Sequence, residues 1–201
     1  MVATVGITTT GFTSEGEKAY PFEQWTSETK EKNNTADTLS YLSSTEKEVV
    51  YYMNLVRTNP QLFAKTYLQK YIDENNLKGT YVNSLQKELM AAKSLAALKV
   101  KKDLFTSAKT HAQVSGETGK TGHFDFSKRF RTYAPRYVSR GENCTYGIKG
   151  SLKNVLDLLI DQNISDLGHR KNILDPDFKY VGLSFQTHKT YKVCLVMDFG
   201  G

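Results

Sequence analysis

The sequence has little cysteine and no long apolar run, and each of these absences excludes a class of protein. Cys144 and Cys194 are its only cysteines, too few for a disulfide-rich scaffold or for a zinc site made of several thiolates. No apolar run approaches the roughly 18 residues needed to span a bilayer. The first thirty residues lack a basic segment followed by an apolar one, so we expect either a cytosolic chain or the mature form of an exported one.

The common short catalytic signatures are also absent. The sequence contains no HExxH, GxSxG, CxxC or glycine-rich phosphate loop, so no local motif of these kinds indicates a reaction type. Its formal net charge of +6, from 27 basic and 21 acidic residues, permits an anionic partner without specifying one. The basic run at 127–131 contains an aromatic residue, but such a run is usually a solvated loop, and we expect no nucleic-acid partner.

The chain divides into a polar leader and one globular domain. Residues 1–40 are rich in Thr, Ser, Glu, Lys and Asn and show no helical or strand period, so we expect a polar tail, a linker or a segment packed on the domain. Trp25 is the residue best suited to hold such a segment in place. Residues 41–201 are long enough to bury the core of a single domain.

The spacing of apolar residues predicts helices followed by strands. Thr45 and Glu48 form a capping-box pattern at the first helix, and Asn59 followed by Pro60 predicts the start of the second. We expect helices over residues 45–58, 60–72, 83–98, 101–119 and 151–162, no helical period in 120–150, and strands over 138–146, 180–187 and 191–199. This order predicts an α+β domain in which helices cover an antiparallel sheet.

Three ionisable residues each follow a glycine, which often bends the backbone to present the next side chain. They are His123, Glu142 and His169. Two imidazoles and a carboxylate suit a divalent transition metal, most simply zinc, and a carboxylate beside a metal-bound water can act as a general base. The three lie far apart in the sequence, so the alternative is that they are separate surface or hydrogen-bonded loop residues.

The other two histidines have simpler interpretations. His111 lies one position from the apolar stripe of its predicted helix, which favours a structural imidazole that is satisfied by a neighbour. His188 falls in the turn between the last two predicted strands, and we expect it to be exposed.

The glycine-flanked motifs carry a family resemblance when they are taken together. GHFDF, GENCTYG and DLGHRKNILDPDFKYVGLSF occur in this order and are followed by VCLVMDFG. This arrangement resembles the CAP superfamily of cysteine-rich secretory, antigen-five and pathogenesis-related-one proteins, also called the SCP-like extracellular domain. It is most similar to the shorter microbial-type branch. The resemblance covers Thr45 to Gly201 and leaves residues 1–40 unexplained.

The resemblance implies a three-layer α-β-α sandwich with a mostly antiparallel central sheet and a large cleft. In that cleft, His123 and His169 match the paired histidines of the family and Glu142 matches its first acidic residue. The second acidic position corresponds to either Asp161 or Gln162, and a glutamine there would remove a carboxylate from the site. Asn143, the neighbour of Glu142, is a further cleft candidate.

The resemblance also implies a secreted or surface-displayed chain whose signal peptide has been removed. We expect a binding or interaction module that holds zinc or another divalent cation through His123, His169 and Glu142 and takes an extracellular ligand, such as a lipid or a cell-surface component. The alternatives are a zinc-dependent hydrolase or protease with Glu142 as general base, which we favour less, a lipid or sterol carrier, and a surface protein that uses neither metal nor lipid.

Both cysteines lie in predicted strands, where each could be a buried thiol. For an exported chain we favour a disulfide between Cys144 and Cys194, which requires their Cα atoms to lie within about 7 Å.

Overall fold

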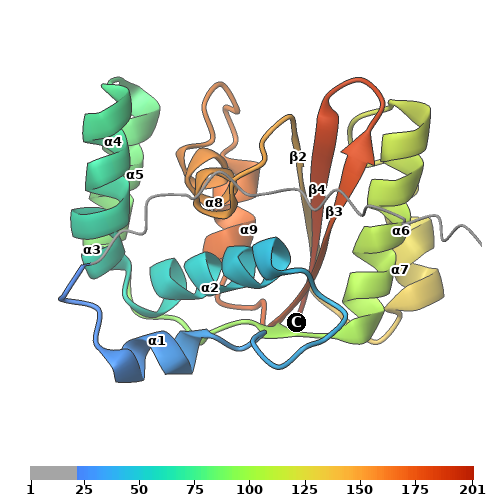
Figure 1. The fold of residues 1–201 in the computed structure, drawn as a ribbon, viewed down its shortest axis with the longest axis horizontal. Coiled ribbons are helices and arrows are strands. Elements are labelled where there is room, and N and C mark those ends of the chain that lie inside the picture. The colour runs from blue at the N-terminus through green and yellow to red at the C-terminus, as the bar shows by residue number, and fades with distance from the viewer. Residues whose placement is uncertain (1–21) are drawn as a thin grey trace, which may run out of the picture.

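The computed structural model describes residues 22–201, which fold into three layers with a sheet between two groups of helices (Figure 1). The described helices, in chain order, are α1 Ser27–Asn33, α2 Ser44–Thr58, α3 Pro60–Phe63, the π-helix η1 Ala64–Leu68, α4 Gln69–Asn75, α5 Thr80–Ala91, α6 Lys102–Thr118, α7 Phe126–Tyr133, α8 Ser151–Ile160 and α9 Gly168–Leu174. None of these helices is both long enough and apolar enough to span a bilayer.

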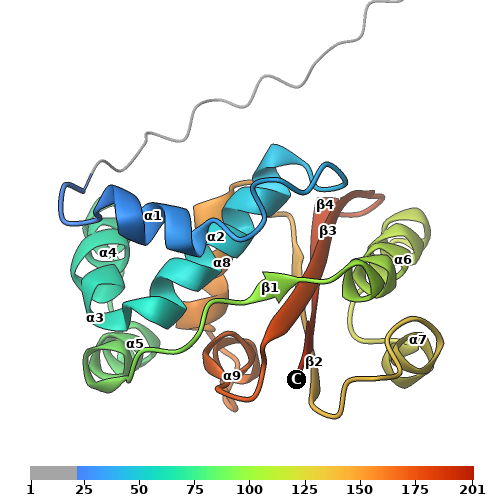
Figure 2. The ribbon, with the colours of Figure 1, turned by 90° about the horizontal axis from the view of Figure 1, so that it is seen from below.

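The sheet has four strands in the order β1-β3-β4-β2. The strands are β1 Lys99–Val100, β2 Arg140–Tyr146, β3 Tyr180–His188 and β4 Lys192–Gly200. β1 pairs with β3 in parallel, whereas β3–β4 and β4–β2 are antiparallel. Helices α6 and α7 lie on one face, and α2, α8 and α9 lie on the other (Figure 2). The α+β class, the three layers and the mostly antiparallel sheet are therefore confirmed.

Local sequence patterns predict one of two helix starts correctly and the other incorrectly. Asn59 caps α3 through its side chain, with Pro60 at the first helical position, as predicted. The capping box of α2 is instead formed by Ser43 and Glu46, so the predicted pair Thr45 and Glu48 is wrong. Both pairs have the right spacing, but Glu46 accepts from the backbone N–H of Phe185 at 2.8 Å while it caps the helix, whereas the carboxylate of Glu48 accepts from Ser151 Oγ at 2.9 Å instead.

Tertiary contacts also end α5 early. The predicted helix over 83–98 instead covers Thr80–Ala91, and the following residues run without helical structure to β1. Arg57 donates through Nε to the carbonyl of Ala96 at 3.1 Å, and Asn54 Oδ1 accepts from the N–H of Leu98 at 2.7 Å. These buried side chains supply the partners that the backbone of residues 92–98 would have had in a helix.

Three short helices fall outside the sequence prediction. They are α1, α7 and α9, and α7 contradicts the expectation of no helical period in residues 120–150. Phe126 and Phe130 stand four apart on α7 with their rings 4.7 Å apart, and Phe130 is fully buried with Leu104 and Tyr137. Eight residues give too short a period to recognise, and the packing of this aromatic pair stabilises the helix instead.

The first 21 residues of the predicted leader, 1–40, lie outside the described residues. Residues 22–40 contain α1 and the buried Trp25, which is 2% exposed. The indole Nε1 of Trp25 donates to Thr66 Oγ1 at 3.0 Å, and its ring lies 5.8 Å from that of Tyr67. Trp25 therefore anchors this segment to the domain at the π-helix.

Candidate functional site

A groove of about 650 Å³ brings together residues from both helical layers and the sheet. His123 comes from the loop between α6 and α7, and His169 comes from the first turn of α9. Asp161, Gln162 and Cys144 also line the groove. The two predicted histidines therefore share one groove, although they stand far apart in the sequence.

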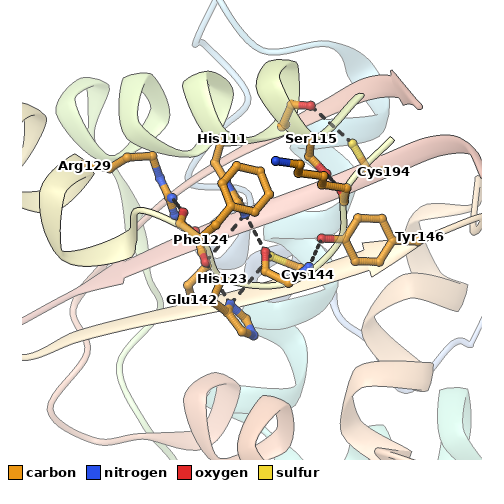
Figure 3. A network of polar contacts seen from close by, with 12 residues as sticks. His111, Ser115, His123, Phe124, Arg129, Glu142, Cys144, Tyr146 and Cys194 are labelled. Atoms are coloured by element: carbon orange, nitrogen blue, oxygen red, sulfur yellow. Dashed lines mark hydrogen bonds and ion pairs between the residues drawn. The ribbon is translucent and has the colours of Figure 1, made fainter. Parts of the chain in front are cut away.

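Glu142 does not belong to the groove lining, and it lies next to His123 (Figure 3). Nδ1 of His123 donates to Glu142 Oε1 at 2.8 Å, and the guanidinium of Arg129 on α7 donates to Oε2. Glu142 is only 6% exposed. Each carboxylate oxygen already accepts from a cationic or N–H partner and Glu142 does not line the groove, so it orients His123 rather than facing a ligand there.

Glu142 and His123 each shift the pKa of the other toward its charged form. Burial by itself would raise the pKa of Glu142, but the hydrogen bond from His123 and the charges of His111 and Arg129 outweigh it and hold that pKa below its ordinary value. The same hydrogen bond, opposed by burial, raises the pKa of His123. Glu142 is therefore ionised at neutral pH and can only accept, which fixes Nδ1 of His123 as the donor.

His169 is held in the same way from the other wall of the groove. Its Nδ1 donates to Asp161 Oδ1 at 2.7 Å, and Asp161 Oδ2 accepts from the backbone N–H groups of His169 at 3.0 Å and Arg170 at 3.3 Å. Asp161 ends α8 in the left-handed region, with φ 55°, and this turn aims its carboxylate at the start of α9.

Of the two candidates for the second acidic position, Asp161 and not Gln162 contacts a histidine of the groove. Asp161 is the second acidic residue of the site, whereas Gln162 lines the groove and donates its side chain to Asn163 Oδ1 at 3.2 Å. Asn143, the other cleft candidate, lies outside the groove and is fully buried. Its amide donates to the carbonyl of His169 at 3.0 Å, so it ties β2 to α9.

The predicted set of three metal ligands is not a compact cluster in the described residues. The donor atoms that lie within 4.8 Å of one another there belong to His111, Glu142 and Cys144, all buried. This cluster includes neither His123 nor His169. His111 Nε2 donates to the carbonyl of Gly122 at 2.8 Å, so His111 is the structural imidazole that its position suggested, and it fixes the backbone beside His123.

Two residues of this site escape prediction from the sequence. The basic run that contains Arg129 predicts a solvated loop, but Arg129 is 6% exposed and pairs with Glu142. Asp198 is fully buried on β4, directly opposite Glu142 in the ladder. Burial and the negative charge of Glu142 raise the pKa of Asp198 well above its ordinary value. The only sequence signal for Asp198 is an acidic residue within an otherwise apolar strand.

The cysteines and His188 differ from expectation. Cys144 and Cys194 are free, buried thiols, so the expected disulfide is not formed in this structure. In the β2–β4 ladder Cys144 faces Val196, whereas Cys194 faces Tyr146. His188 is 3% exposed, which contradicts the prediction of an exposed turn residue. Its Nδ1 accepts from the N–H groups of Thr190 and Tyr191, and this turn buries the ring.

The solved structures that resemble this chain include three proteins of low sequence identity. An outer surface protein from Borrelia burgdorferi has 16% identity and a TM-score of 0.44, over 72% of this chain and 93% of its own. Venom allergen-like protein 4 from Schistosoma mansoni has 16% identity and a TM-score of 0.46, over 79% and 89%. An extracellular protein with an SCP domain from Bacillus anthracis has 14% identity and a TM-score of 0.42, over 79% and 44%.

None of the curated proteins matches the sequence. The sequence model of the CAP family, described as the cysteine-rich secretory protein family, matches residues 50–199. This range includes both histidines of the groove and the carboxylates that hold them. The chain therefore belongs to the CAP, or cysteine-rich secretory protein, family.

Proposed function

We propose that this chain is an extracellular binding module whose groove holds a divalent cation, zinc in the first instance, through Nε2 of His123 and of His169. The observation that carries this proposal is the matched pairing of each histidine with a carboxylate through Nδ1, at 2.8 and 2.7 Å. Membership of the CAP family supports an extracellular location.

The donor set fits such a cation. Metal-binding histidines commonly donate their second ring N–H to a carboxylate, which fixes the tautomer and raises the basicity of the ligating nitrogen. The side chain of His123 is 52% exposed and that of His169 is 23% exposed, although Glu142 and Asp161 are buried. A cation bound by two imidazole nitrogens would keep coordination positions open for donor atoms of an external ligand.

Elemental analysis after dialysis against zinc tests the proposal directly. We expect the wild-type chain to retain close to one zinc per chain, and His123→Ala and His169→Ala to retain at least tenfold less. Asp37→Asn is the control, because Asp37 is exposed and lies outside the groove lining, and it should retain the wild-type amount. Equal zinc in all four proteins would refute the metal site.

The geometry favours a binding module over a hydrolase. A general base must reach the groove, but Glu142 is buried, both its oxygens are engaged and it does not line the groove. We therefore expect no turnover of peptide or ester substrates by the zinc-loaded protein. Turnover that survives repeated purification and disappears in Glu142→Gln, with zinc still bound, would favour the hydrolase instead.

A lipid carrier is the second candidate, because three apolar side chains form part of the groove lining. They are Ile148, Leu158 and Ile164. Organic extraction of the purified protein followed by mass spectrometry tests it, and a stoichiometric lipid would support this candidate.

A further inference from the structure

Strand β2 separates the two walls of the groove and lies at one edge of the sheet. The strand order β1-β3-β4-β2 leaves β2 paired on one side only, with β4. Cys144, Thr145 and Tyr146 of β2 line the groove together with His123 and His169. The groove therefore runs along an open sheet edge, a feature that proteins usually shorten, charge or cover.

The hydrogen bonds at the two ends of the ladder fix which main-chain groups of β2 face outward. Ser139 and Gly201 exchange both of their backbone hydrogen bonds, and at the other end Gly147 donates to Val193 at 2.8 Å. Antiparallel pairs alternate between residues that bond to the partner strand and residues that do not. The odd-numbered residues of β2 therefore bond to β4, and the even-numbered ones direct their N–H and C=O groups away from it.

Of the four even-numbered residues of β2, Arg140 begins the strand outside the groove lining, and the other three differ in what covers them. Asn172 of α9 donates to the outward carbonyl of Glu142 at 3.2 Å, which closes that end of the edge. For Cys144 and Tyr146, no hydrogen bond outside the ladder reaches the main chain among the described residues. Both residues line the groove, and although Cys144 is only 8% exposed, their outward N–H and C=O groups belong to the stretch of edge that borders the groove.

We infer that the groove binds a polypeptide segment in extended conformation, which adds to the edge of β2 at Cys144 and Tyr146 and lies alongside His123 and His169. The inference rests on the proposed function of the groove as a ligand site. Its occupant is specified by the main-chain groups: a donor and an acceptor repeat at every second residue, and only another extended polypeptide repeats acceptors and donors at that interval.

The nature of the contact predicts how binding depends on the ligand. Strand addition takes its affinity from main-chain hydrogen bonds, so it tolerates changes of side chain but requires N–H groups at alternate positions of the ligand. A lipid or a small anion has no such alternation. A second copy of this chain could also pair at the edge, and the experiment must separate that case.

Selection from a phage-displayed library of random ten-residue peptides, with the full chain as target, supplies the probe. Recovered peptides are resynthesised with one N-methyl group at each successive position, and their affinities are measured by calorimetry in EDTA. We expect N-methylation at every second position to weaken binding at least tenfold, and the positions between to change it less than threefold. A uniform effect, or recovery of no specific peptide, would overturn the inference.

Amide hydrogen exchange locates the contact on the protein. We expect the N–H groups of Cys144 and Tyr146 to exchange rapidly in the free chain and to become protected with peptide, whereas those of Asn143 and Thr145 are protected throughout. Protection of Cys144 and Tyr146 that rises with protein concentration, without peptide, would assign the edge to a second copy and overturn the inference.

The metal and the peptide can fail separately. Zinc retention without alternating N-methyl effects would leave the proposed function and refute the peptide. Alternating effects in EDTA, with no zinc retained by the wild-type chain, would support the peptide and refute the metal site.

Discussion

At the residue scale, His123 and His169 are oriented by the same device, although they come from opposite helical layers. Each donates through Nδ1 to a buried carboxylate, Glu142 in one case and Asp161 in the other. The carboxylates are themselves fixed, Glu142 by Arg129 and Asp161 by two backbone N–H groups of α9. Because Glu142 does not line the groove and both oxygens of Asp161 already accept hydrogen bonds, the imidazoles are the groups best placed to bind a ligand.

Replacing Glu142 should change the titration of His123. The hydrogen bond from Glu142 raises the pKa of His123 against the opposing effect of burial. In metal-free Glu142→Gln the stabilising anion is lost, so the pKa of His123 should fall, as measured by NMR titration of its ring protons. Asp161→Asn is the matched control and should leave the pKa of His123 unchanged. An unchanged value in Glu142→Gln would show that this pair does not exist in solution.

Asp198 should limit stability at neutral pH. Its carboxyl is fully buried and neither oxygen has a hydrogen-bond partner among the described residues, and its pKa is raised well above 3.8 by burial and by Glu142. The folded state thus keeps a proton that the unfolded state releases, and stability falls as pH rises between the two pKa values.

Asp198→Asn removes this dependence. Relative to wild type, its free energy of unfolding should gain about 1.4 kcal/mol for each pH unit above about 4, up to the folded pKa of Asp198. Urea unfolding at a series of pH values measures the difference. A constant difference from about pH 4 to about pH 8 would mean that Asp198 is ionised in the folded protein.

At the element scale, the position of α6 depends on a close approach to β3. A Cβ atom on Gly182 would lie 1.9 Å from the backbone N of Phe105 and 2.1 Å from the carbonyl carbon of Leu104. Neither backbone atom can move without displacing the start of α6. This contact gives a physical reason for the glycine in the VG pair of the sequence motif, since α6 carries His111 and borders the His123 loop.

Gly182→Ala should therefore be destabilising. We expect a loss of about 1–3 kcal/mol, in the range of overpacked cores, measured from the midpoint of urea unfolding. Gly168→Ala is the matched control: its Cβ would meet only the carboxylate of Asp166, at 3.5 Å or more. A Gly182→Ala variant as stable as Gly168→Ala would show that α6 can shift without cost.

At the scale of the whole molecule, the domain does not begin where the polar composition ends. Trp25 and Ala36 belong to the same hydrophobic core as α2 and α8, and Thr35 Oγ1 donates to the carbonyl of Leu98 at 2.7 Å. The segment over 22–40 thus supplies core contacts that composition does not reveal, because one tryptophan and a few hydrogen bonds suffice to attach a polar segment.

Trp25→Ala should lower stability substantially. Truncation of a buried aromatic residue costs about 3–5 kcal/mol, and deletion of residues 1–40 should cost at least as much. Thr66→Val is the control, because it keeps the buried indole and removes only a hydroxyl, which accepts from Trp25 Nε1 and donates to the carbonyl of Leu62, and it should cost about 1–3 kcal/mol. Thermal melting compares the variants, and a deletion that melts with the wild type would show that the anchor is dispensable.

The sequence by itself determined the residue types, their order and the family. The glycine-flanked motifs identified His123, Glu142, His169 and the strands around them, because local spacing and motif order are properties of the chain. It also determined the start of α3 at Asn59 and Pro60, since a cap and its proline are neighbours.

Only the tertiary structure decided how these residues act. The left-handed turn at Asp161 made it, rather than Gln162, the partner of His169. The helix α7 brought Arg129 to Glu142 and so fixed that carboxylate behind the groove lining, where it orients His123. The physical reason is that hydrogen bonds between layers depend on which side chains meet after packing, and residues far apart in sequence carry no local signal of that meeting.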